Sequence, residues 1–227
     1  MAARRIVMLG PPGSGKGTYS RLLAESLAVP HHSTGDMLRA EIVKGSAIGA
    51  EAANYTTEGK QVPSSLVSVM VKASIDRSPG GWILDGFPRS VSQAEALSRM
   101  ATVDRVVAIS MRRDLLIRKL FGRRLCPECG VAWNIESIDE DGIAMPPMLP
   151  SGQHNGDPCG AHCMPKLTSR DDDREDVIVR RLQLWGETEN DLISFYNAST
   201  VDVTHIEILG GVEKMLPAFK TAVGLNS

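Results

Sequence analysis

The fold is decided by one stretch near the amino terminus, Ile6-Val7-Met8-Leu9-Gly10-Pro11-Pro12-Gly13-Ser14-Gly15-Lys16-Gly17-Thr18. An apolar run, typical of a buried strand, leads through a glycine-rich turn into a helical pattern. Glycines let backbone N–H groups approach an anion closely, and a helix start adds partial positive charge. The spacing G-x4-G-K is typical of a nucleotide-phosphate loop, with Gly17 where Ser or Thr is usual and the hydroxyl at Thr18. A plain strand-to-helix glycine turn is the alternative.

Further short apolar runs at 82–84, 106–109 and 204–209 alternate with helical stretches. This alternation predicts an α/β fold, a parallel sheet flanked by helices, that ends in a helix near Val212. Residues 33–63 form a largely helical region between glycines. Residues 126–165 contain all four cysteines and few aliphatic periodicities, so we expect a small insert with its own stabiliser that takes no part in the main core.

Composition excludes several classes of protein. The 227 residues are 42% hydrophobic and 23% charged, which is ordinary for a globular domain. With 25 Lys and Arg against 27 Asp and Glu, the net charge of −2 offers no general attraction to nucleic acid or an anionic membrane. No apolar run approaches the ~20 residues of a membrane span. We expect no nucleic-acid or membrane partner, a monomer, and a cytoplasmic location by default.

The cysteines form two short motifs, Cys126-x2-Cys129 and Cys159-Gly-Ala-His162-Cys163. The first is typical of a zinc knuckle, and the second offers three ligands for two places. A redox disulfide or unpaired buried thiols are the alternatives. The 29 residues between Cys129 and Cys159 exceed a compact spacing, so part of this interval is expected to loop out. His31, His32 and His154 have no evident metal partners and are expected at the surface.

Three more segments identify the kind of phosphate loop. They are Ser33-Thr34-Gly35-Asp36-Met37-Leu38-Arg39, then Asp85-Gly86-Phe87-Pro88-Arg89 with Gln93, and Arg170-Asp171-Asp172-Asp173 with Arg181. Together with the loop, this set resembles the adenylate kinase family, in its long form with a cysteine-bearing lid. The resemblance spans about residues 6–196.

The resemblance implies a fold of the P-loop NTPase type with two inserted lobes. The core would comprise residues 1–32, 63–121 and 173–227. A nucleoside-monophosphate lobe would occupy residues 33–62, and a zinc-stabilised lid residues 122–172. The implied reaction is reversible phosphoryl transfer from Mg-ATP to AMP, giving two ADP.

The resemblance also assigns roles to residues. ATP would be held by Gly13, Ser14, Gly15, Lys16, Gly17, Thr18, Lys119 and Arg123. AMP would be held by Thr34, Arg39, Lys60, Val62, Gly86, Arg89, Gln93, Arg170 and Arg181. Catalysis would depend on Lys16, Arg89, Arg123, Arg170 and Arg181, and magnesium would be held through water by Asp85 and Asp172. Zinc would be held by Cys126, Cys129, Cys159 and Cys163, with His162 as the alternative to Cys163.

Elementary chemistry agrees with an arginine-rich site. A phosphate acceptor is already an anion and needs no strong base, so the task is to bring two polyanions together and stabilise the moving charge. Arginine suits this task because its fork donates two hydrogen bonds to phosphate and keeps its proton. For Arg124, a role in the site and a position at the surface are both open, since neighbouring side chains do not point the same way. The chain shows no evident Ser-His-Asp or Cys-His nucleophile.

Two alternatives concern the donor and the class of protein. Lys119 stands where the resemblance leads us to expect an arginine stacked on the donor base, which leaves a GTP-dependent AMP kinase open. A nucleotide-driven binding module is the more distant alternative. Residues 126–163 contain no Lys or Arg but several acids, and such a segment would repel a phosphate backbone.

Overall fold

A computed structural model describes residues 4–150 and 160–225. Its centre is a five-stranded sheet in the order β2-β3-β1-β4-β9, with every neighbouring pair parallel. The strands are β1 (Arg5–Leu9), β2 (His31–Ser33), β3 (Trp82–Asp85), β4 (Arg105–Ser110) and β9 (Asp202–Glu207). The predicted parallel α/β sheet is confirmed. The short β2 was not among the predicted strands because its polar residues give no apolar run.

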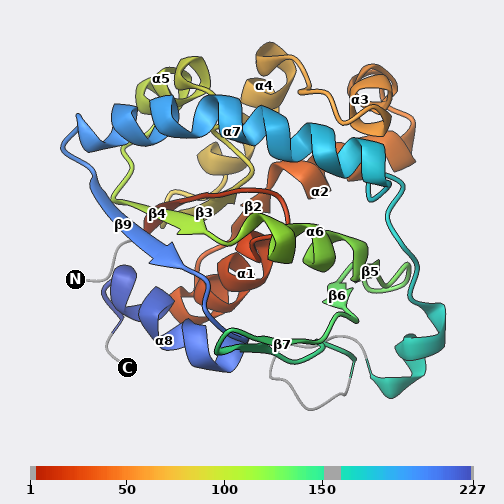
Figure 1. The fold of residues 1–227 in the computed structure, drawn as a ribbon. Helices are drawn as coiled ribbons and strands as arrows, with labels where there is room; N and C mark the ends of the chain where they lie inside the picture. Colours follow the sequence, from red (N-terminus) through yellow and green to blue (C-terminus); the bar gives the residue numbers. More distant parts are fainter. Residues whose placement is uncertain (1–3, 151–159, 226–227) are drawn as a thin grey trace.

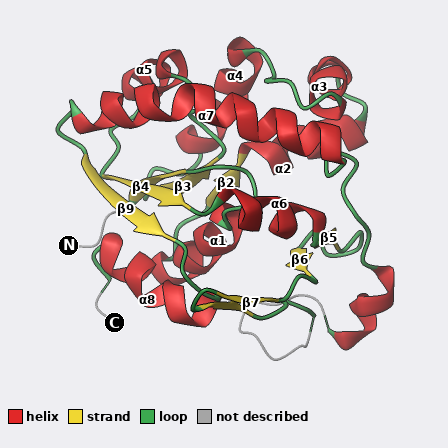
Figure 2. Ribbon diagram, viewed as in Figure 1, coloured by secondary structure: helices red, strands yellow, loops and turns green. Residues whose placement is uncertain are grey.

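Helices cover both faces of the sheet, as Figures 1 and 2 show. One face carries α1 (Lys16–Leu27) and α8 (Val212–Ala222). The other carries α2 (Thr34–Lys44), α4 (Ser64–Asp76), α5 (Val91–Met100) and the long α7 (Glu175–Asn197). Successive residues of β1 alternate between the two layers, because strand side chains point to opposite faces. Ile6 and Met8 join the α1 side, while Val7 and Leu9 join the α7 side.

Residues 33–62, here called the helical lobe, contain α2 and α3 (Ala47–Thr57). Each helix starts with a serine cap: Ser33 Oγ accepts from the Asp36 amide at 3.3 Å, and Ser46 Oγ from the Gly49 amide at 3.0 Å. Such caps satisfy N–H groups that a helix start leaves without partners. The lobe packs Leu38 and Ala52 into the α7-side core.

Residues 122–172, here called the cysteine lobe, follow α6 (Arg113–Phe121). The lobe contains two antiparallel pairs, β5 (Arg123–Leu125) with β6 (Ala132–Asn134) and β7 (Ile138–Glu140) with β8 (Ile143–Met145). A 3-10 helix, η1 (Ala161–Lys166), completes the described part.

The β7–β8 hairpin overturns one prediction. The expectation that part of residues 130–158 loops out stays a prediction, since 151–158 lie outside the described residues. Residues 126–165 were also expected to stay out of the main core. Instead Ile138, Ile143 and Met145 are buried in the α1-side core, against residues of β9 and α8. The turn is Asp141-Gly142, with φ of 50° and 75°. An Asp-Gly pair between alternating apolar residues favours a tight hairpin, but this signal covers only a few residues of a segment rich in cysteine and proline.

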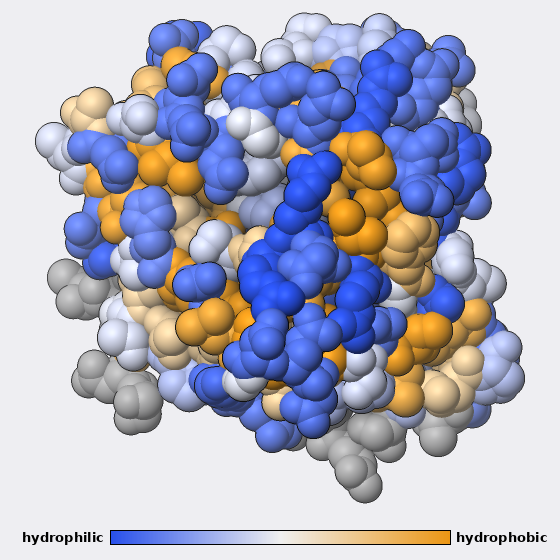
Figure 3. All heavy atoms as spheres, in the orientation of Figure 1, coloured by the Kyte–Doolittle hydropathy of each residue, from blue (hydrophilic) through white to orange (hydrophobic). Residues whose placement is uncertain are grey.

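Among the helices formed by the described residues, none combines the length and apolar character needed to cross a bilayer. Figure 3 shows hydrophilic residues down the middle of one face, with apolar patches on both sides of them.

Candidate active site

A cleft of about 1140 Å³ opens at the carboxyl ends of the sheet strands. Single-ligand pockets usually measure ~300–1,000 Å³, so this cleft has room for more than one small ligand. Every residue that the resemblance assigned to nucleotide or magnesium lines it: Gly13–Thr18, Thr34, Arg39, Lys60, Val62, Asp85, Gly86, Arg89, Gln93, Lys119, Arg123, Arg170, Asp172 and Arg181. The structure therefore brings together residues spread over most of the chain.

The phosphate loop connects β1 to α1. Gly13 adopts a φ of +90°, and a Cβ there would stand 2.9 Å from the Leu116 carbonyl oxygen of α6. At Gly17 a Cβ would stand 3.3 Å from an Asp85 carboxylate oxygen, so a larger residue there would crowd that carboxylate. Lys16 Nζ donates to the Pro11 carbonyl at 2.7 Å, and burial lowers the pKa of Lys16 to about 8.

Asp85 ends β3 beside the loop. Burial raises the pKa of its carboxyl, but the nearby His31 ring and the charge of Lys16 outweigh burial and hold it below the ordinary value. An ionised carboxylate at this edge suits a hydrated Mg²⁺, which keeps several waters.

His31 is a cleft residue that the sequence reasoning missed. Its Nε2 lies 3.8 Å from Asp85 Oδ2, and its side chain is only 18% exposed. His32 is also partly buried, 3.0 Å from Ser78 Oγ. The prediction that both are surface residues is wrong, since β2 places them at the sheet; His154 lies outside the described residues. No local signal marks His31, because β2 is too short and polar to be recognised and only its pairing with β3 brings His31 near Asp85.

Three arginines meet where the cysteine lobe joins α7. Arg123 makes a two-pronged ion pair with Asp173, whose side chain is only 2% exposed. Arg181 donates to Asp172 at 2.7 Å. Arg170 Nε is buried without a hydrogen-bond partner among the described residues. Burial lowers the pKa of both Arg170 and Arg181 to about 10, so both stay charged at neutral pH.

These contacts refine the predicted roles of the acids. Asp172, expected near the metal waters, accepts from Arg181 in this structure. Asp173 was not assigned a role, yet it holds Arg123. Arg124, left at even odds, donates to the carbonyls of Phe121 and Arg123 at 2.8 and 2.7 Å, and it is not a cleft residue.

On the side of the helical lobe, Gln93 is nearly fully buried. Its Oε1 accepts from the Arg89 amide at 2.8 Å, and its Nε2 donates to Ser64 Oγ at 3.0 Å. An amide has two donors and two acceptor sites, so one of each is left for a ligand. Arg89 Nε donates to the Gly86 carbonyl at 2.9 Å, which leaves the rest of its fork open to the cleft. Arg39 pairs with Asp36, and Lys60 with Glu58.

On the opposite side, Lys119 lies in the last turn of α6. Burial lowers its pKa, and Glu136 opposes that effect. The Lys119 carbonyl accepts from Asn134 Nδ2 at 2.7 Å, which ties α6 to β6. The same cleft is also lined by Trp133, Met145, Pro146 and the segment 210–212.

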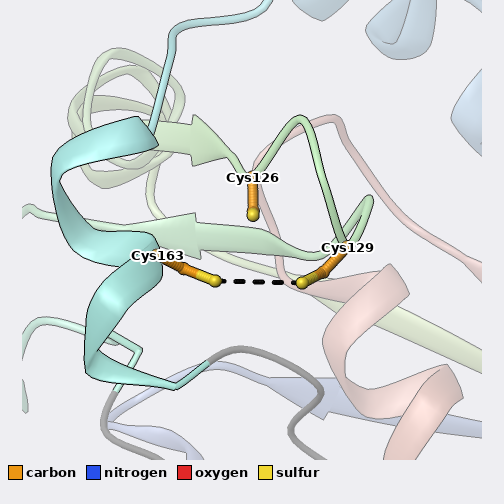
Figure 4. Close-up of side chains that lie close together, drawn as sticks. All are labelled: Cys126, Cys129 and Cys163. Carbon is orange, nitrogen blue, oxygen red and sulfur yellow. Dashed lines mark hydrogen bonds between the residues drawn. The ribbon is translucent and has the colours of Figure 1, made fainter.

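The cysteines gather as the zinc prediction requires, as far as the structure describes them. The sulfurs of Cys126, Cys129 and Cys163 all lie within 4.8 Å of one another and point together in Figure 4. Cys163 is buried, whereas His162 is exposed with Nε2 3.4 Å from the Cys163 sulfur. Cys159 lies outside the described residues. Three convergent thiols fit a soft metal such as Zn²⁺.

Comparison with known proteins adds independent findings. A family model described as adenylate kinase matches residues 8–201. An adenylate kinase of Hydrogenobaculum sp. is 38% identical over 223 residues, which cover 93% of this chain and 99% of the relative. The chloroplastic adenylate kinase 1 of Arabidopsis thaliana is 34% identical over 230 residues, covering 97% and 77%. A GTP:AMP phosphotransferase of Plasmodium falciparum is 36% identical over 212 residues, covering 92% and 91%.

Proposed function

This chain belongs to the adenylate kinase family and is a phosphotransferase that converts ATP and AMP reversibly into two ADP, and we propose which of its residues carry out that transfer. One observation carries the proposal: Lys16, Arg39, Arg89, Arg123, Arg170 and Arg181 all line a single cleft. Such a set of cations neutralises two polyanions and stabilises charge on the moving phosphoryl group.

The donor phosphates lie in the Gly13–Thr18 loop, against the α1 amino terminus and Lys16. Arg89 and Arg39 bind the phosphate of AMP, with Thr34, Lys60, Val62, Gly86 and Gln93 around its nucleoside. Arg123, Arg170 and Arg181 approach the transferring group. Because Asp172 and Asp173 already hold Arg181 and Arg123, the two guanidinium groups are oriented before nucleotide binds, and little further side-chain freedom is lost on binding.

Adenylate kinases use Mg²⁺ with the nucleotide, where the ion offsets charge on the phosphates. Asp85 would hold the waters of this Mg²⁺. Asp172, paired with Arg181, would add negative charge on the same side of the cleft. For the cysteine lobe we propose a structural Zn²⁺ held by Cys126, Cys129 and Cys163, with Cys159 as the fourth ligand. The buried position of Cys163 favours it over the exposed His162.

We further propose that the helical lobe closes over AMP and the cysteine-bearing part of the cysteine lobe closes over the donor. Closure would exclude water, which otherwise competes with AMP as the acceptor.

The test is a coupled assay of the purified protein with Mg-ATP and each of AMP, GMP, UMP and CMP. ADP should form with AMP far faster than with the other three. Equal rates with all four would contradict the assigned AMP pocket, and no transfer to any would contradict the function. Metal analysis of the same sample should give one zinc per chain.

GTP as the donor is the second candidate, because Lys119 replaces the expected arginine and one relative is named as a GTP:AMP phosphotransferase. A lysine is a donor only, and guanine offers two acceptors, O6 and N7, on the edge where adenine offers one acceptor and one donor. Turnover with ATP and with GTP at equal AMP separates the two donors.

A further inference from the structure

Ion pairs connect the β7–β8 hairpin and the residues before it to α6. Arg118, on the helix turn that carries Lys119, donates to Glu136 at 2.8 Å, to Glu140 at 2.7 Å and to the Ser137 carbonyl at 3.0 Å. All three acceptors belong to the segment that enters and forms β7. Arg112, just before the same helix, reaches Glu140 at 3.1 Å and Asp141 at 2.5 Å. The acidic insert therefore finds its positive partners on the core.

The hairpin is also fastened to the core by packing. Ile138, Ile143 and Met145 are at most 6% exposed and lie in the core cluster that includes Phe219. The Gly211 amide donates to the Ala144 carbonyl at 2.8 Å. A Cβ on Gly211 would stand 3.0 Å from Pro146 Cδ, so the hairpin and the segment after β9 are in close contact.

This contact forms one end of the cleft. Met145, Pro146 and Met148 line it together with Lys119 and the segment 210–212. Thr34, Arg39, Lys60 and Val62, which are assigned to AMP, lie at the other end, in or next to the helical lobe. Given the proposed function, the donor phosphates occupy the loop between these ends, and the donor base therefore lies beside Lys119 and the hairpin.

We propose that Arg118 is a positioning residue for the donor: it fixes the β7–β8 hairpin against the core, so that the slot for the donor base exists before nucleotide binds. Arg118 itself does not line the cleft. It acts through the hairpin and through the α6 turn that carries Lys119. A slot formed in advance spares the ordering cost that a loose hairpin would add to donor binding. In this arrangement only the cysteine-bearing part of the lobe moves when the donor enters.

The kinetic test compares Arg118→Gln with the wild type. The two ion pairs of Arg118 are about one-third exposed and therefore weakened by solvent, so their loss should raise KM for the donor roughly threefold. KM for AMP and kcat should stay within about twofold, since the AMP end and the phosphate contacts are untouched. Arg118→Lys should recover part of the loss by keeping one of the contacts.

Arg105→Gln is the matched control. Arg105 pairs with Asp202 at 2.9 Å on the sheet, away from the cleft lining, so its loss should leave all three parameters unchanged. An unchanged donor KM in Arg118→Gln would overturn the inference while leaving the proposed function intact. An inactive wild type would instead overturn the proposed function. Equal rises of both KM values would show a general structural role and would also overturn the inference.

Hydrogen exchange gives a readout that does not depend on activity. In the nucleotide-free wild type, the Gly211 amide should exchange as slowly as the amides of β9, because a fixed hairpin keeps its bond to Ala144. Arg118→Gln should speed exchange at 208–212 without affecting β1 or β4. Exchange at Gly211 as fast in the wild type as in the variant would show that the hairpin is not fixed by Arg118.

Discussion

At one end of the cleft, the helical lobe consists of two capped helices, whereas at the other end the cysteine lobe has four strands of three residues each. The helical lobe caps both helices with serine side chains and places Leu38 and Ala52 into the main core. Three-residue strands bury too little to be stable on their own. The buried residues of the cysteine lobe outside its hairpin are centred on a cluster of Cys126, Trp133 and Cys163.

The comparison teaches that two lobes on one core can be stabilised by different means. We attribute the stability of the helical lobe to its helix caps and to the apolar layer that it shares with the core. The cysteine lobe divides in two. The β7–β8 hairpin shares the main core, and the part around β5, β6 and η1 packs around Cys126, Trp133 and Cys163, where the proposed Zn²⁺ would supply stability. Metal binding stabilises a small unit that lacks a sufficient core.

The largest effect is expected from Arg89→Ala, which removes a cation from the AMP side of the cleft. The Arg89 side chain is exposed and its Nε donates to the Gly86 carbonyl, so the variant should keep its fold and lose about 10²–10³-fold in kcat/KM. Steady-state kinetics with varied AMP, together with a thermal melt, measure both quantities. Arg99→Ala is the control, because Arg99 is equally an arginine but lies exposed at the end of α5. A lower melting temperature with unchanged kcat/KM would contradict the role of Arg89 in binding AMP and would indicate a structural role.

The next effect tests the two means of stabilisation directly. Cys126→Ser should lower the melting temperature by roughly 5–10 °C and remove bound zinc, because a thiolate ligand is lost from the smaller unit. Calorimetry and metal analysis measure this. A chelator should lower the melting temperature of the wild type to that of the variant, and it should not lower the melting temperature of the variant further.

The helical lobe should show the opposite pattern. Leu38→Ala should cost about 2–4 kcal/mol of unfolding free energy by leaving a cavity, with the zinc content unchanged. A chelator should add the same destabilisation to Leu38→Ala as to the wild type. Any loss of zinc from this variant would show that the two lobes are not independently stabilised.

A smaller effect concerns pH. The pKa of Lys16 is lowered to about 8 by burial, so the free protein loses this positive charge as the pH rises through 8. A bound triphosphate favours the charged form, and donor affinity should therefore fall about tenfold between pH 7 and pH 9. Titration calorimetry at three pH values measures it. AMP binding, which Lys16 does not contact in our assignment, should lack this dependence.

The smallest effect is expected from Lys119→Arg. A guanidinium group that stacks flat on the base no longer directs its donors at the acceptors on the edge of guanine, so the ratio of kcat/KM for ATP to that for GTP should rise about threefold. A donor competition assay measures the ratio. No change in it would place the donor base away from Lys119.

The parts of the fold that the sequence predicts well have strong local signals. The apolar runs of β1, β3 and β4 and the glycines after Leu9 place the sheet and the phosphate loop, and the motif arginines all reach the cleft. The missed features depend on tertiary contacts. His31 becomes a cleft residue only because β2 pairs with β3, and Asp173 matters only because Arg123 lies opposite. The Asp141-Gly142 hairpin had a local signal, but nothing in its sequence shows that Ile138 and Met145 would meet α8.

The ion pairs of Arg123 and Arg181 have a consequence for how the empty enzyme meets the ions of its surroundings. With Asp173 and Asp172 as built-in counter-anions, the vacant cleft carries less net positive charge than its arginines suggest. Inorganic phosphate and other small anions should therefore bind only weakly to these two arginines. A ligand that engages the phosphate loop and these two arginines at once competes better with the internal carboxylates.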